Sequence, residues 1–228
     1  MSSQSLFFMS LRDIGFWLRS ARADAALQRY KAGRGAAEAF DLLYRESIDP
    51  WGFDLPQYRY QKRKYDTLVT LLPDRRFGET LDLGCGIGFM TERLAKRSDR
   101  VLGLDVSQVA VSAARERFAG QPAVSFDQAD VMNLPTSLDG RFDLVVVADV
   151  LYYLQPMSNG LLKQVASRIA GLLRPGGLCL LANHFFFDVD PDSKLSRRIH
   201  QAFAWSPSFN SISEHRRPFY LATLLERA

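Results

Sequence analysis

The residues of this chain whose types and spacing indicate chemistry are three alternate glycines placed directly after a short apolar run. That run, Leu81–Leu83, contains the acid Asp82. A second acid, Asp105, ends the next apolar run, 101–104. Glycines let a backbone approach a ligand closely, and an acid one strand later is placed to accept hydrogen bonds from a ribose diol. The pattern predicts a nucleoside-binding turn, and its glycines are Gly84, Gly86 and Gly88.

The spacing of the glycines discriminates between two kinds of cofactor. Dinucleotide-binding enzymes use G-x-G-x-x-G, in which a helix start meets a pyrophosphate, whereas the spacing here is G-x-G-x-G. S-adenosylmethionine (SAM) has no phosphate but carries an ammonium that Asp82 can bind. Tyr60 and Lys64 do form the Y-x-x-x-K spacing of short-chain dehydrogenases. They precede the glycine turn, however, and those enzymes carry the pair after it, so SAM is the predicted cofactor.

Acids recur at the ends of the later apolar runs. The runs 124–130 and 142–149 predict a third and a fourth strand, which end in Asp130 and Asp149. Ligands of open parallel sheets bind at the carboxyl ends of the strands, so Asp130 is placed to accept a hydrogen bond from the adenine amino group. Asp149 is expected to contact SAM or orient an acceptor ammonium, or else to cap the following turn. The residues after the second and third acids complete the predicted cofactor contacts: Val106 and Val131.

Two further residues are candidates for catalysis. Methyl transfer from a sulfonium is an in-line displacement, which requires that the nucleophile be held in place and water excluded. An amine acceptor must also lose a proton, and His184, just after a predicted fifth strand at 178–181, is a candidate general base. The alternative is that His184 only caps the strand. Tyr152 is the second candidate, because Tyr152 and Tyr153 can line an acceptor cavity. No metal site is predicted.

The succession of strands, from the glycine turn to the R-P-G-G turn at 174–177, resembles the class I SAM-dependent methyltransferases. Three further segments narrow the resemblance: a D-P-W turn at 49–51, the helix Tyr60–Leu68, and V-L-Y-Y-L at 150–154. Across residues 44–183 the chain is similar to the nodulation protein S family of N-methyltransferases. Gln61 stands where the pattern of that family has Glu.

The resemblance implies roles for two residues upstream of the glycine turn. Trp51 would lie against the methionine part of SAM, and Lys64 would reach the SAM carboxylate with its ammonium. Each residue also has a purely structural alternative. Trp51 can anchor the helix turn in the core, and Lys64 can be a solvated helix charge.

The resemblance also implies the architecture. It predicts a Rossmann-like α/β fold with a seven-stranded, mostly parallel sheet, helices on both faces and an antiparallel C-terminal strand. The segment 218–225 is the candidate for that strand and is expected to be buried on both faces. Residues 1–72 are predicted to form an N-terminal helical cover, and residues 73–228 the SAM-binding core. A chain of 228 residues with 47% hydrophobic content is large enough for this core.

Three features of the sequence indicate which partners and which cellular compartment to expect: an apolar face near the start of the chain, the net charge and the cysteines. Four apolar residues fall on one helical face near the start of the chain: Phe7, Leu11, Ile14 and Leu18. That face is expected to pack on the domain or on a second copy of the chain as a homodimer, with weak peripheral membrane contact as the alternative. A net charge of +4 is too mild to indicate nucleic acid. Cys85 and Cys179 lie on separate elements, which is typical of a reduced, cytoplasmic protein.

Together these patterns predict a SAM-dependent methyltransferase that acts on a small-molecule or sugar acceptor, by N-methylation of an amine. Two alternatives remain. One is an O-methyltransferase of a small metabolite, which would require a stronger base. The other is a catalytically inactive SAM-binding protein that serves as a partner of other enzymes.

Overall fold

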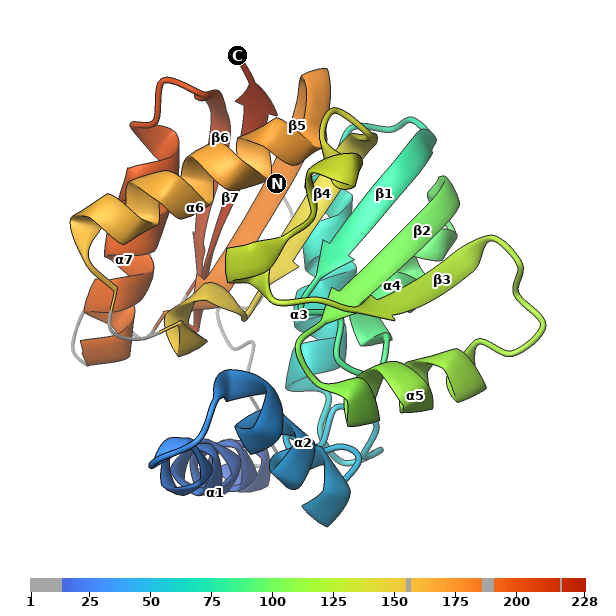
Figure 1. Cartoon of the computed structure of the whole chain (residues 1–228), viewed down its shortest axis with the longest axis vertical. Coiled ribbons are helices and arrows are strands. Elements are labelled where there is room, and N and C mark those ends of the chain that lie inside the picture. The colour runs from blue at the N-terminus through green and yellow to red at the C-terminus, as the bar shows by residue number, and fades with distance from the viewer. Residues whose placement is uncertain (1–13, 155–156, 186–190, 218) are drawn as a thin grey trace, which may run out of the picture.

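The protein folds around a sheet of seven strands, as the sequence predicts (Figure 1). The computed structural model describes residues 14–154, 157–185, 191–217 and 219–228. The strand order is β3-β2-β1-β4-β5-β7-β6, with the first five strands parallel and the last two antiparallel to their neighbours. The strands are β1 (Phe77–Leu83), β2 (Ser98–Asp105), β3 (Val124–Gln128), β4 (Phe142–Ala148), β5 (Leu173–His184), β6 (Phe209–Arg217) and β7 (Tyr220–Arg227).

Helices cover both faces of the sheet, which confirms the predicted layers. The described α-helices are α1 (Ile14–Lys31), α2 (Ala36–Glu46), α3 (Tyr60–Thr70), α4 (Phe89–Ala95), α5 (Gln108–Arg117), α6 (Asn159–Leu172) and α7 (Pro191–Ala204). Helices α6 and α7 pack on one face, and α3 and α4 pack on the other. Three short 3-10 helices are η2 (Val131–Asn133), η3 (Thr136–Leu138) and η4 (Leu151–Tyr153).

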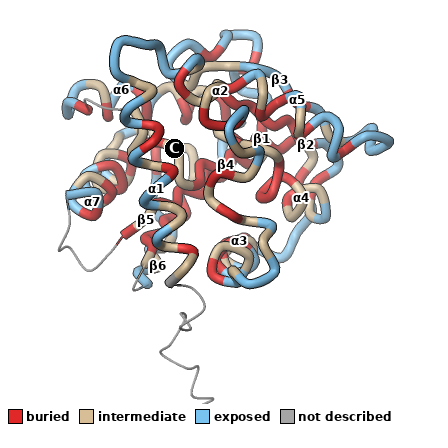
Figure 2. The backbone as a smooth tube through the Cα atoms, turned by 90° about the horizontal axis from the view of Figure 1, so that it is seen from below, coloured by how far each residue is buried: buried red, intermediate tan, exposed pale blue. Residues whose placement is uncertain are grey.

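The core is centred on β4, whose residues alternate between the two faces. Val145 and Val147 pack with α6 and α7, whereas Leu144 and Val146 pack with α3 and α4. Such continuous apolar character is typical of a parallel strand covered on both sides. Figure 2 shows the buried residues gathered along the strands in the middle of the molecule, with exposed stretches of helix outside.

The C-terminal strands follow the prediction in part. Strand β7 is antiparallel to β5 and buried over Tyr220–Leu225, as expected for the segment 218–225. It does not form the edge of the sheet, however, because β6 pairs with its outer side. Strand β6 forms the edge of the sheet on this side, and its Ile212 is 51% exposed. The sequence did not indicate β6, because an edge strand needs no apolar alternation.

The two first helices lie beyond the carboxyl ends of the strands (Figure 1). The predicted apolar face of α1 is wrong at Leu18, which is 58% exposed. Phe7, Leu11 and the side chain of Ile14 lie outside the described residues. The buried side of α1 instead carries Phe16 and Ala23, together with Ala26 and Leu27, which pack on α2. Small side chains let two helices approach closely, and this contact decides which face is buried.

Neither a dimer nor a membrane contact through the start of the chain follows from the described residues. Within them, no helix combines the length and the apolar character needed to cross a membrane. The predicted cover, residues 1–72, is divided in the structure. Helices α1 and α2 lie at the end of the sheet, while α3 joins the layer on its face, with Tyr65 and Leu68 in the core.

Candidate functional site

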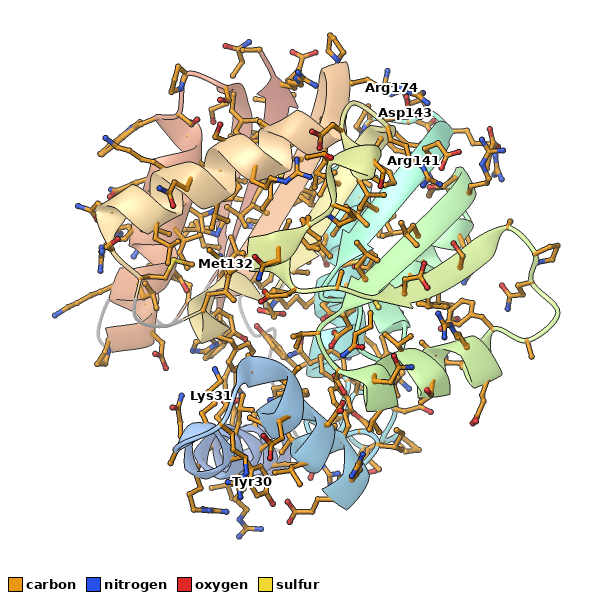
Figure 3. All side chains as sticks on the ribbon, viewed as in Figure 1. Tyr30, Lys31, Met132, Arg141, Asp143 and Arg174 are labelled. Atoms are coloured by element: carbon orange, nitrogen blue, oxygen red, sulfur yellow. The ribbon has the colours of Figure 1, made fainter. Side chains whose placement is uncertain are left out.

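A pocket lies where α2 and the turn after it meet the carboxyl ends of the strands. Ten of the thirteen predicted site residues line this pocket: Trp51, Asp82, Gly84, Gly86, Asp105, Val106, Asp130, Val131, Asp149 and Tyr152. The other three, Lys64, Gly88 and His184, are not among its lining residues. The opposite end of the sheet carries surface ion pairs such as Arg174 with Asp143 (Figure 3).

Asp105 is fixed in place by two backbone groups. Its Oδ2 accepts a hydrogen bond from the Gly86 amide at 2.8 Å, and its Oδ1 accepts one from the Ser107 amide at 2.9 Å. Gly86 has a φ of 53°, and a Cβ there would approach the Tyr44 hydroxyl to 2.9 Å. A glycine is therefore required at this close approach. Burial raises the pKa of Asp105.

Asp82 lies at the floor of the same region. It is 2% exposed, and the Thr91 hydroxyl donates to its Oδ2 at 2.6 Å. Burial, together with the nearby Asp105, raises the pKa of Asp82 to about 7, although the hydrogen bonds from Thr91 act in the opposite direction. A cation bound beside Asp82 would favour its ionised form.

Asp130 ends the third strand region and caps the short helix η2. Its Oδ1 accepts from the Met132 amide at 2.9 Å, and its Oδ2 accepts from the Asn133 side chain at 3.2 Å. These two bonds hold the carboxylate at the rim of the pocket. Its oxygens keep further lone pairs that can accept hydrogen bonds from a ligand. The predicted contact with an adenine amino group stays a prediction.

Helix α2 is tied to the cofactor side by Asp41, which sequence reasoning missed. Its Oδ1 accepts from the Ser107 hydroxyl at 2.6 Å and from the Val109 amide at 3.1 Å. These groups lie at the start of α5, where an acid is favourable because the first amides of a helix are unpaired. Asp41 thereby holds α2, with its Tyr44, over the pocket.

The D-P-W turn positions Trp51 in the pocket wall. Asp49 accepts hydrogen bonds from the amides of Phe53 at 2.8 Å and Asp54 at 2.9 Å, closing the turn. From α1, Arg19 donates to the carbonyl of Asp49 at 2.8 Å and to that of Pro50 at 3.1 Å. The motif is thus a rigid support for Trp51.

Aromatic rings surround Trp51 in the wall of the pocket. The Trp51 ring lies 6.0 Å from that of Tyr44 and 6.1 Å from that of Tyr153, measured between centroids. One oxygen of Asp24, on α1, accepts from the Trp51 indole N–H at 3.1 Å and from the Tyr153 hydroxyl at 2.9 Å. Lys31, on the side of α1 that faces the sheet, donates to the Tyr153 carbonyl at 2.7 Å (Figure 3).

The structure gives Lys64 a partner other than the predicted SAM carboxylate. Its ammonium contacts both oxygens of Asp149, at 2.7 Å and 2.5 Å. The Lys64 side chain is 2% exposed and that of Asp149 is 11% exposed, so the pair is almost fully buried. Asp149 also has a φ of 59°, which among the described residues only it and glycines adopt. The pair fixes Asp149 at the pocket.

His184 is the last residue of β5, at the ligand-bearing end of the sheet. Its ring packs at 5.2 Å from the ring of Trp17, and its backbone pairs with Tyr220. Its role as a general base stays a prediction. Another histidine, His200, is buried in α7, and burial lowers its pKa to about 3, so it remains uncharged near pH 7.

Gly88 precedes α4 and serves packing in this structure. Its φ is 89°, and a Cβ at this position would lie 2.6 Å from the Phe118 ring. The positive φ and the close ring are each sufficient to favour a glycine here. Its predicted cofactor contact remains untested.

Comparisons with known proteins agree with this geometry. Residues 80–177 match the family described as "Methyltransferase domain". Nodulation protein S of Sinorhizobium fredii is 30% identical, over 72% of this chain and 72% of its own length. The chain belongs to the nodulation protein S family of class I SAM-dependent methyltransferases. Nodulation protein S of Rhizobium tropici is 31% identical, and the match covers 69% of this chain but only 63% of that protein.

The fold of this methyltransferase also matches a solved relative. The crystal structure of N-methyltransferase NodS from Bradyrhizobium japonicum, in complex with S-adenosylhomocysteine (SAH), has a TM-score of 0.67 and 21% identity. The match covers 82% of this chain and 97% of that one. Because the chain belongs to a SAM-dependent methyltransferase family, SAM is its cofactor.

The pocket of this methyltransferase fits SAM in one further respect. Among the described residues, Gln61 lines the pocket with a side-chain oxygen that is buried and has no hydrogen-bond donor. A buried acceptor without a donor is costly, and a ligand N–H would satisfy it. The ammonium of SAM is such a donor. Gln61 is also the position at which this chain departs from the family pattern.

Proposed function

We propose that this methyltransferase transfers the SAM methyl group to the nitrogen of a small-molecule amine. The observation that carries this proposal is the buried Asp149 carboxylate, held by Lys64 at a pocket whose lining also includes the rings of Trp51, Tyr152 and Tyr153. Aromatic faces and a fixed carboxylate together favour a cation over a neutral hydroxyl. The solved relative is itself named an N-methyltransferase, which supports the same reaction class.

The residues on the cofactor side would hold SAM by its polar groups. Asp105 would accept from the ribose hydroxyls, Asp82 would face the ammonium, and Asp130 would accept from the adenine amino group. When bound, SAM supplies a methyl group on a sulfonium. The protein mainly has to hold both reactants and exclude water.

The residues on the acceptor side would bind and orient the amine. Asp149 would accept a hydrogen bond from the acceptor amine, because Lys64 holds its carboxylate in position. Trp51 and Tyr153 would close the space around the acceptor and exclude water. Small or sugar amines suit the site, because between residues 187 and 208 only α7 follows the sheet and no separate substrate domain is present in the described part of that segment.

Two other functions remain as alternatives. Transfer to oxygen would need a base strong enough for a hydroxyl, and His184 is the candidate carried over from the sequence. A SAM-binding protein without activity is the second alternative. The intact turn around Gly86 and Asp105 supports SAM binding equally in both cases.

The first experiment is calorimetric titration of the purified protein with SAM and SAH, with NADH as the matched negative control. Binding of SAM and SAH alone is expected. Turnover is then measured as SAH formed with D-glucosamine and n-butylamine, against D-glucose and n-butanol. Methylation of an amine supports the proposal, methylation of the alcohols alone indicates an O-methyltransferase, and SAH binding without any turnover favours the inactive module.

A further inference from the structure

Helix α3 brings one amide side chain to the wall of the pocket. Gln61 and Tyr65, one turn apart on α3, both line the pocket. The side-chain oxygen of Gln61 is buried, and within the described parts of the chain no group donates a hydrogen bond to it. An unpaired buried acceptor destabilises the free protein. Its place at the pocket therefore indicates a ligand that brings a hydrogen-bond donor to this point.

The order of the strands indicates which part of SAM lies nearest to Gln61. Asp105 ends β2 and Asp130 follows β3, and these acids are the proposed contacts of the ribose and the adenine. The sheet continues from β2 through β1 to β4 and β5. Helix α3 packs on a face of β1, β4 and β5, where its Tyr65 and Leu68 belong to the same apolar cluster as the strands. A SAM molecule with its adenosine over β2 and β3 would direct its amino-acid end toward α3.

Two acids already lie in this part of the pocket. Asp82 is on β1 and Asp149 follows β4, and both line the pocket. Burial, and then the charges of Asp149 and Asp82, raise the pKa of Tyr65 well above its ordinary value, so both acids act on the helix turn next to Gln61. Lys64 compensates the charge of Asp149. An amide oxygen adds a further acceptor for an ammonium without a third negative charge, which would repel the carboxylate of the same amino-acid end.

We propose that Gln61 binds the amino-acid end of SAM, and that its side-chain oxygen accepts a hydrogen bond from the ammonium. Recognition of the cofactor then includes α3, a helix that precedes the glycine turn. The contact also gives selectivity, because 5′-methylthioadenosine keeps the adenosine and the sulfur but has no amino-acid part. This inference rests on SAM as the cofactor and does not depend on which acceptor is methylated.

The test is the cofactor selectivity of Gln61→Met. Methionine has a similar length and forms helices well, but it removes the amide. By calorimetric titration, the SAH dissociation constant is expected to rise about 10- to 100-fold, the range for hydrogen bonds to charged groups. The dissociation constant of 5′-methylthioadenosine should stay within about threefold. The preference of the protein for SAH over this smaller ligand should therefore shrink by nearly the whole factor.

Thermal unfolding separates binding from a packing role. Gln61→Met removes the unpaired acceptor, so the Tm of the free variant should be equal to that of the wild type or higher. The increase in Tm on adding SAH should be smaller in the variant, because SAH binds less tightly. Gln121→Met makes the same change at an exposed residue between α5 and β3, and it should alter neither the Tm nor the two affinities.

Two results would overturn the inference. An equal loss of affinity for SAH and for 5′-methylthioadenosine would show that Gln61 only shapes the pocket. Unchanged SAH affinity in Gln61→Met would show that its oxygen does not face the cofactor. Failure of the proposed N-methylation is a separate result, because loss of selective SAH binding in Gln61→Met supports the inference even where neither amine probe is turned over by the wild type.

Discussion

The two sides of the pocket are built over very different distances along the chain. On the cofactor side, Asp105 accepts from amides 2 and 19 residues away. On the acceptor side, Lys64 and Asp149 are 85 residues apart, and Asp24 and Tyr153 are 129 apart. The cofactor side is thus assembled within the sheet itself, while the acceptor side exists only when the N-terminal helices are docked. Substitutions on the two sides should therefore affect different measurements.

The largest effect is expected for Lys64→Gln. It leaves Asp149 as an uncompensated buried charge, which costs about 3–5 kcal/mol of unfolding free energy. Urea unfolding followed by fluorescence measures this loss. The double variant Lys64→Met with Asp149→Asn removes both charges and should recover most of the stability. Lys62→Gln, on the same helix but exposed, is the control.

If Lys64→Gln and Lys62→Gln unfold at the same urea concentration, the pair does not hold the acceptor side together. The acceptor side would then not depend on this long-range ion pair, because apolar packing alone would attach α3 to the pocket.

Asp105→Ala is expected to have the next largest effect, on the cofactor side. Loss of charged hydrogen bonds to the ribose should raise the SAH dissociation constant about 10- to 100-fold. Removing the carboxylate also leaves the amides of Gly86 and Ser107 unpaired, so unfolding free energy should fall by about 1–3 kcal/mol. Calorimetric titration and thermal melting measure the two effects. Asp99→Ala, at the exposed start of the same strand, is the control, and equal SAH affinity in both variants would remove Asp105 from the site.

Asp82 should make cofactor binding depend on pH. Its pKa of about 7 lies above the ordinary 3.8, so the unfolded chain gives up this proton first, and the free protein should lose stability from about pH 4 to pH 7. A bound ammonium favours the ionised carboxylate. SAH affinity should therefore rise up to about tenfold between pH 6 and pH 8 and level off above it.

Titration in buffers of different ionisation enthalpy tests this proton release directly. Protons should leave the protein on SAH binding at pH 6, and Asp82→Asn should abolish both the release and the pH dependence. An affinity that is flat from pH 5.5 to pH 8 in the wild type would show that no cation binds beside Asp82.

The smallest effect is expected for Asp41→Ala, which joins the two sides. Loss of a helix cap costs about 1 kcal/mol, and because α2 covers the pocket, SAH affinity should fall by a few-fold. Glu38→Gln, exposed on the same helix, should change neither value. Loss of stability without loss of affinity would show that α2 does not contribute to cofactor binding.

The same contrast explains what the sequence could predict. The strands and the acids in or after them follow from local apolar runs in the sequence. These runs were sufficient to predict that Asp82, Asp105 and Asp130 lie in one pocket. The edge strand β6 escaped prediction, because its residues are mostly exposed. Leu18 was assigned to the buried face because it is apolar, but the contact with α2 buries Ala26 and Leu27 instead.

The residues that sequence reasoning missed share one property. Asp24 and Asp41 are acids on cover helices, where an isolated acid is typical of a solvated surface. Their partners lie 129 and 66 residues away in the chain, so no local pattern could reveal them. The Asp149 partner of Lys64 was missed for the same reason, since it follows the fourth strand, 85 residues away; the predicted contact of Lys64 with the SAM carboxylate stays a prediction. Only the orphaned oxygen of Gln61 had a sequence signal, its departure from the family pattern.

The hydrogen bond from the Tyr60 hydroxyl to the carbonyl of Phe219 joins residues that are 159 positions apart in the chain. Contacts of such separation form late, because the intervening chain must be ordered before they are favourable. Helices α1 and α3, although early in the chain, pack in part against Phe219 and β7, so the surface on which they dock is complete only when β7 is in the sheet. Completion of the acceptor side should therefore coincide with the last phase of folding, and a ligand that reports on this side can serve as a kinetic marker for it.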